Sequence, residues 1–214
     1  ASAPWAQVVK AYGGSDELNR TIKKMVADGK RRDECWEAIW DREVRRFEHD
    51  PEFRDAVKDI YETAGVNLLS VTPWVHDSSL SERVGQRRDL SRWQARFEAA
   101  DWLQKVTSPR EARRVPEDGD VGIILNTQNV GATIDSSVDE VDVLYNEGIR
   151  IFQLTYNRQN LLATGCNDPS NGGLSTSGRD VVDRINRLGG IVDLSHCGKR
   201  TTLDTIEYSE DPVA

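Results

Sequence analysis

The feature that most constrains the fold is an alternation of short apolar runs with helix-like segments from Val66 to the end of the chain. The run over residues 121–125 is continuous, which is typical of a strand buried on both faces of a parallel sheet. The runs are residues 66–72, 121–125, 149–155 and 189–192, and residues 212–214 resemble the start of another. The alternation predicts parallel β/α units, either in an open doubly wound sheet or in part of a (β/α)8 barrel. A complete barrel takes eight strands and about 250 residues. The four strands and the start of a fifth predicted here are too few to close one.

The N-terminal part of the chain carries helix signals in place of strand signals. Cap residues and apolar side chains at three- and four-residue spacing indicate successive helices there. We therefore expect a helical N-terminal region over residues 1–65, followed by barrel-type β/α units over residues 66–214. Between the first two strands we expect one amphipathic helix over Leu90–Val106 and a charged connection over Pro109–Glu117.

The composition excludes several functional classes. The 214 residues include 36 acidic and 28 basic side chains, and the net charge of −8 disfavours binding to nucleic acid. No apolar run approaches the roughly 18–20 residues that a membrane span needs. The three cysteines are an odd number and are far apart, which favours a reducing compartment over a disulfide framework. We therefore expect a cytoplasmic globular protein without a membrane span.

Polar side chains follow the predicted strands at their carboxyl ends, where α/β sheets and barrels place their ligands. Asn129, Tyr156 and His196 each occupy such a position. A histidine there can be a metal ligand or a proton-transfer group, but it can equally be buried and hydrogen-bonded to its neighbours. His76 follows the first strand, and for it we expect a structural or surface role.

Asp193 lies three residues before His196, so on an ideal strand the two side chains would point to opposite faces. If the chain leaves strand geometry near Ser195, the Asp193 carboxylate could orient the imidazole. Otherwise it would bond a neighbouring backbone group and have no chemical role. The sequence leaves both alternatives open.

Several segments together resemble the membrane (renal) dipeptidase family of metallopeptidases. They include Gly148–Asn157, which reads Gly-Ile-Arg-Ile-Phe-Gln-Leu-Thr-Tyr-Asn, and Val192–His196, which reads Val-Asp-Leu-Ser-His. The resemblance covers roughly Gly119–Ala214 and is thin before it. It implies an α/β fold that is part of a (β/α)8 TIM-type barrel, and a chain that is a fragment of a longer, divergent family member.

The resemblance also assigns roles to individual residues. His196 falls where the family has a zinc-binding histidine, and Pro212–Ala214 fall where the sixth barrel strand begins. Asn129 occupies the place of a glutamate that bridges two metal ions, and an amide cannot bridge them as a carboxylate does. Tyr156 replaces a substrate-contacting histidine, and its hydroxyl could donate to a developing oxyanion. The family's His-x-Asp metal pair does not occur in this chain.

These implications define the expected function. We expect a zinc-dependent dipeptidase-like hydrolase that cleaves dipeptides or a similar small amide, with His196 on the metal and Tyr156, Asn129 and Asp193 as catalytic candidates. The family binds two Zn²⁺ ions, and one or none is conceivable here. The alternative is a barrel of the same lineage without the dinuclear centre, acting on another small amide or only binding one. A homodimer is left open, as is a fragment that folds only in part.

Overall fold

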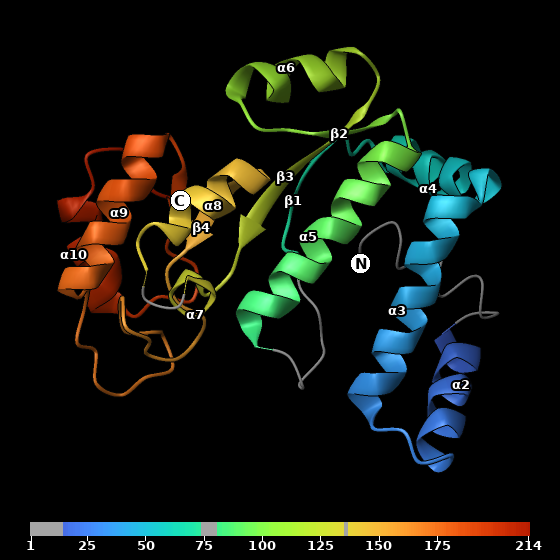
Figure 1. Ribbon diagram of the computed structural model, residues 1–214, viewed down its shortest axis with the longest axis horizontal. Helices are drawn as coiled ribbons and strands as arrows, with labels where there is room; N and C mark the ends of the chain where they lie inside the picture. Colours follow the sequence, from blue (N-terminus) through green and yellow to red (C-terminus); the bar gives the residue numbers. More distant parts are fainter. Residues whose placement is uncertain (1–14, 74–80, 135–136) are drawn as a thin grey trace. The chain divides into compact units, whose positions relative to one another are not determined.

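The computed structural model of the protein describes residues 15–73, 81–134 and 137–214 (Figure 1). Helices and strands alternate from β1 onward, after an N-terminal series of helices. In chain order the elements are α2 (Ser15–Ala27), α3 (Arg32–His49), α4 (Pro51–Ala64), β1 (Leu68–Val71), α5 (Glu82–Ala99), β2 (Leu103–Lys105), α6 (Pro109–Glu117), β3 (Val121–Thr127), α7 (Val130–Thr133), α8 (Glu140–Glu147), β4 (Ile149–Gln153), α9 (Thr176–Leu188), β5 (Ile191–Asp193) and α10 (Lys199–Tyr208).

The strands form a sheet in the order β1-β3-β4-β5, with β2 paired to β3. β3 pairs with β4 and β4 pairs with β5, in both cases parallel. In this register Gln153 lies opposite Asp193, at the carboxyl ends of β4 and β5. Parallel strands joined through helices confirm the predicted α/β class.

Two of the expected elements are wrong. The helix expected over Leu90–Val106 is α5, which starts and ends earlier, and Leu103 belongs to β2. The helix ends at Ala99, and the backbone of Ala100 is extended, with φ −138° and ψ 105°. The charged connection expected over Pro109–Glu117 is α6, whose start is capped by Ser108 and has proline in the first turn.

By its contacts the chain divides into two compact units. The first comprises Ala1–Leu69, Trp74–Gln104 and Ala112–Gly122. One apolar cluster in this unit joins α2 and α3, and Trp36 packs against it; its buried members are Leu18, Ile22, Cys35 and Ile39. α4 buries one face, through Phe53, Val57 and Tyr61.

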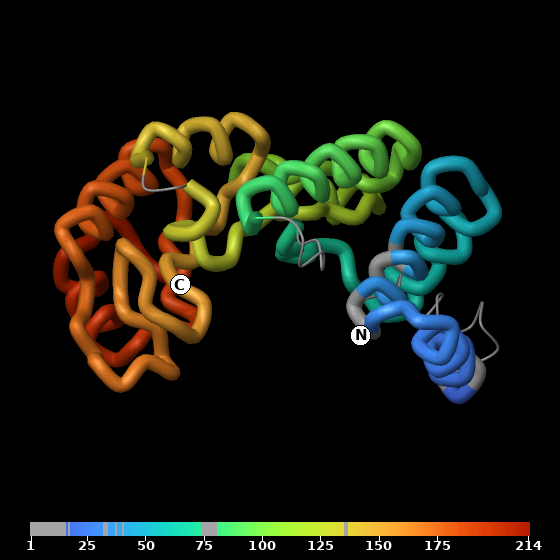
Figure 2. Tube along the Cα trace, turned by 60° about the horizontal axis from the view of Figure 1, so that its bottom comes forward, coloured from blue at the N-terminus to red at the C-terminus, as the bar shows by residue number. Residues whose placement is uncertain are grey.

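The second unit comprises Ser70–Pro73, Lys105–Glu111 and Ile123–Ala214. Its core lies between the strands and the helices that pack on them, α8 on β4 and α9 on β5. Figure 2 traces the course of the chain through this unit, which ends in red at the C-terminus. Arg184 on α9 holds Asp142 on α8 through two bonds of 2.7 Å, so the two helices are also joined at the surface. Buried apolar side chains of this core include Leu125, Val141, Leu144, Phe152, Val181, Val182, Ile185 and Val192.

The last residue already pairs with β5. The N–H of Ala214 donates to the Val192 carbonyl at 2.9 Å, and the N–H of Leu194 donates to the Ala214 carbonyl at 2.8 Å. This is the bonding pattern of a parallel neighbour, as expected for residues 212–214 at the start of a strand. The expected boundary between residues 65 and 66 stays a prediction. Among the described helices, none has the length and apolar character to cross a bilayer.

Candidate active site

The candidate site forms where the chain leaves β4 and β5. Because these strands are parallel neighbours, their carboxyl ends lie side by side, and the segments 154–157 and 194–197 emerge together. Thr155 is fully buried between them, and its hydroxyl lies 3.4 Å from the His196 carbonyl oxygen. The two segments are therefore held together, and this contact sets the positions of their side chains.

His196 is exposed, so the alternative of a buried histidine is wrong. Its backbone is left-handed, with φ 61°, a conformation that turns the imidazole out of the strand direction. The imidazole Nδ1 lies 2.8 Å from the Asn157 amide oxygen Oδ1. The Tyr156 ring lies against the imidazole, with a centroid separation of 4.4 Å and an interplanar angle of 33°. Two predicted site residues, Tyr156 and His196, are thus brought into contact.

The Asp193 carboxylate serves the turn that leads to His196. Its Oδ1 accepts a hydrogen bond from the Ser195 N–H at 2.8 Å, the bond of an Asx-turn. Of the two alternatives that the sequence left open, the structure therefore shows the bond to a neighbouring backbone group. A catalytic role for Asp193 stays a prediction.

Asn129 lies at the start of α7 and is also left-handed, with φ 58°. Its Oδ1 accepts from Asn160 Nδ2 at 2.9 Å, and the same nitrogen donates to the Leu154 carbonyl at 2.8 Å. Asn129 is therefore tied to the end of β4 through Asn160. The expected substrate role of Asn129 stays a prediction.

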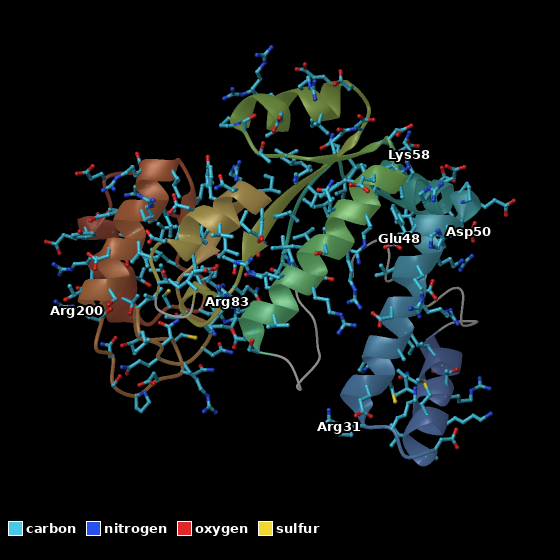
Figure 3. All side chains as sticks on the ribbon, viewed as in Figure 1. Arg31, Glu48, Asp50, Lys58, Arg83 and Arg200 are labelled. Atoms are coloured by element: carbon cyan, nitrogen blue, oxygen red, sulfur yellow. The ribbon has the colours of Figure 1, made fainter. Side chains whose placement is uncertain are left out.

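The loop 158–175 is fastened around the site by backbone bonds. The Cys166 N–H donates to the His196 carbonyl at 2.8 Å, and the Gly198 N–H donates to the Thr164 carbonyl at 2.8 Å. Arg200, labelled on α10 in Figure 3, adds a bond of 3.0 Å from its N–H to Asn171 Oδ1. Gly165 lets the loop approach, since a Cβ there would lie 2.4 Å from the Asn157 carbonyl carbon.

The donor set near His196 suits part of a metal site. In residues 15–73, 81–134 and 137–214, no three His, Cys, Asp or Glu side chains are grouped to hold a metal ion. Burial raises the pKa of the Cys197 thiol, so without a metal this sulfur stays protonated at neutral pH. His196 fits as one ligand, because an exposed imidazole with one bonded nitrogen retains a second nitrogen for a metal. His76 lies outside the described residues.

Asn157 is a polar residue at a predicted strand end to which the sequence interpretation gave no role. It follows Tyr156 in a loop, has φ 65°, and bonds His196 across 39 positions of the chain. The available signal was its place in the Leu-Thr-Tyr-Asn run at the end of a buried strand. That signal marks a position near the site but does not identify the partner, which only the parallel pairing of β4 and β5 provides.

The chain is similar to known proteins both in sequence and in structure. In sequence, the chain is 33% identical over 100 residues to an uncharacterised dipeptidase of Schizosaccharomyces pombe, covering 45% of this chain and 24% of that protein. In structure, it resembles an amidohydrolase from Pseudomonas aeruginosa (TM-score 0.66, 29% identity), covering 72% of this chain and 46% of that one. It also resembles a metallopeptidase of family M19, dipeptidase AC (TM-score 0.67, 18% identity), covering 79% and 59%.

The chain thus spans less than two thirds of the length of each of these proteins. The likeness to dipeptidase AC bears on the fold alone and, with the amidohydrolase, confirms that the β/α units are part of a (β/α)8 TIM-type barrel. The model of the membrane dipeptidase family, peptidase family M19, matches residues 30–214. The chain therefore belongs to the membrane dipeptidase family, and its relatives are dipeptidase-like hydrolases.

Proposed function

We propose that the protein is a zinc-dependent hydrolase that cleaves dipeptides or similarly small amides, with His196 as a metal ligand. The observation that carries the proposal is the exposed His196 imidazole at the carboxyl end of β5, held by Asn157 and stacked on Tyr156. Membership of a metallopeptidase family supports both the reaction and the need for a metal.

Three residues of this chain would have separate roles in the reaction. A bound divalent metal would polarise the substrate carbonyl and activate a water molecule. His196 would hold it through the ring nitrogen that Asn157 leaves unbonded. Tyr156, with 40% of its surface exposed, could present its hydroxyl to the oxygen that gains negative charge during attack on the amide. Asn160 would keep the loop 158–175 in place beside β4.

A second candidate is a barrel of this lineage with one metal ion or none, acting on another small amide or only binding it. What favours it is the neutral amide of Asn129, already bonded to Asn160, at the place where the family resemblance puts a bridging carboxylate. Counting zinc ions per molecule of the intact protein separates the candidates. A cytoplasmic location and a homodimer remain proposals.

The direct test is dipeptide hydrolysis by the intact protein, with and without a chelator. His196→Ala should lower the rate by more than about 100-fold, because even residues that only orient metal ligands cost 10–100-fold. His49→Ala is the matched control, since His49 is an exposed histidine at the end of α3. Activity that survives both chelation and His196→Ala would contradict the metal role.

A further inference from the structure

We propose that Asn157 is a positioning residue that fixes His196 in the tautomer with the proton on Nδ1 and the lone pair on Nε2. An amide oxygen can only accept a hydrogen bond, so a neutral imidazole whose Nδ1 lies 2.8 Å from Asn157 Oδ1 must carry its proton on Nδ1. Within the part of the chain that the structure describes, Nε2 has no hydrogen-bond partner. The nitrogen suited to a metal is therefore selected before any metal binds.

The orientation of the Asn157 amide is set by its surroundings. The Cys166 thiol lies 3.6 Å from the same oxygen and 3.7 Å from Asn167 Oδ1, so its one proton can be donated to either. The Asn157 carbonyl accepts from the Asn167 N–H at 2.8 Å, which holds the backbone in its left-handed conformation. In this orientation the carbonyl end of the amide, not its NH₂ end, faces the imidazole.

The orientation of the His196 imidazole is also restrained by a ring contact. Tyr156 lies against one side of the imidazole, so rotation of His196 out of its bond with Asn157 would break the stacking contact as well. Asn157 and His196 are both left-handed, at φ 65° and 61°, and this geometry turns the two side chains toward each other from neighbouring strand exits. Histidine ligands commonly have their second ring nitrogen held by an oxygen acceptor in this way.

The tautomer can be tested in the metal-free intact protein, independently of activity. Long-range ¹H–¹⁵N NMR, with His196→Gln to assign the signals, should show Nδ1 protonated and Nε2 unprotonated above the pKa of the ring. Asn157→Gly keeps a residue that tolerates φ 65° but removes the amide, and should yield a mixture of tautomers. Asn157→Asp restores an acceptor at the same position and should restore the single tautomer. An unchanged tautomer in Asn157→Gly would overturn the inference.

The consequence for metal binding rests on the proposed function. Asn157→Gly should weaken zinc binding by about 10- to 100-fold, and Asn157→Asp should recover most of it. Asn146→Ala, at an exposed position of α8, is a control that should change neither quantity. If His196→Ala leaves zinc affinity intact, the proposed ligand role fails, whereas the NMR result still decides the role of Asn157.

Discussion

The Tyr156 ring and its hydroxyl have separable roles, because only the ring contacts His196. Tyr156→Phe keeps the stacked ring and removes the donor. If the hydroxyl stabilises a developing oxyanion, kcat for dipeptide hydrolysis should fall by about 10²- to 10³-fold. Zinc affinity should stay within about twofold, since the support of His196 is retained. Unchanged kcat in Tyr156→Phe would leave the residue with a packing role alone.

Asn160 joins three segments through one side chain. Its Oδ1 accepts from the N–H groups of Leu162 and Ala163, at 2.8 and 3.1 Å, and its Nδ2 donates to Leu154 and Asn129. Asn160→Ala leaves two N–H groups of buried residues without an acceptor, so the free energy of unfolding should fall by about 2–4 kcal/mol. Urea denaturation measures this, with exposed Asn146→Ala as control. A loss below about 0.5 kcal/mol would mean that water replaces these bonds.

For single residues of the site, the sequence predicted where the side chains lie better than it predicted their hydrogen-bond partners. His196 and Tyr156 could be located because each follows a buried strand, and parallel strands share one carboxyl edge. The roles of Asn157 and Asn160 could not, since each depends on a loop that closes on a segment distant in sequence. Asp193 shows the converse, because its bond to Ser195 is local and was one of the two alternatives stated from the sequence.

Among the elements, α6 begins with a cap that depends on a charge. Glu111 Oε2 accepts from the Thr107 N–H at 2.8 Å and from its hydroxyl at 2.9 Å, while Ser108 Oγ accepts from the Glu111 N–H. These bonds, above all the one from the Thr107 backbone, hold the pKa of Glu111 below its usual 4.5. Glu111→Gln should therefore destabilise the protein by about 1 kcal/mol at pH 7.

The stability lost in Glu111→Gln should depend on pH in a definite direction. Because the folded pKa of Glu111 is depressed, its stabilisation is present above pH 4.5 and is lost as the pH falls through the folded pKa. The difference in unfolding free energy between the wild type and Glu111→Gln should therefore shrink below pH 4.5. Glu117→Gln, an exposed change in the same helix, should show no such trend. A difference that is constant from pH 7 to pH 3 would contradict the charged cap.

The cap also explains which elements could be predicted. The Ser-Pro-Arg-Glu run at residues 108–111 is a helix start signal, but the charge of the segment outweighed it in the sequence interpretation. The error over Leu90–Val106 has another cause: β2 continues the apolar spacing of α5, so periodicity alone does not separate them. The strand β3 was predictable because its apolar run over residues 121–125 is uninterrupted, whereas β4 shows apolar side chains around the polar Arg150.

For the whole molecule, the relationship to a barrel bears on the apolar side chains that α10 exposes. Leu203 and Ile206 lie three positions apart on this helix, so they share a face, and they are 54% and 56% exposed. Exposed apolar pairs on one helix face mark a surface that another element can cover. In a closed (β/α)8 barrel, each outer helix packs between two others. We therefore expect this face to be covered in a form of the protein extended to the length of its relatives.

Replacing both apolar side chains with serine should then have a small effect on one form of the protein and a large effect on the other. In the 214-residue chain, Leu203→Ser with Ile206→Ser should reduce binding of a hydrophobic dye and change the free energy of unfolding by about 1 kcal/mol or less, because the side chains are already in water. In the extended form it should cost about 2–5 kcal/mol for each buried side chain. Lys199→Ser with Glu207→Ser, at exposed polar positions of α10, is the control. Equal losses in both forms would show that no neighbouring helix covers this face, because a side chain already in water has no burial to lose.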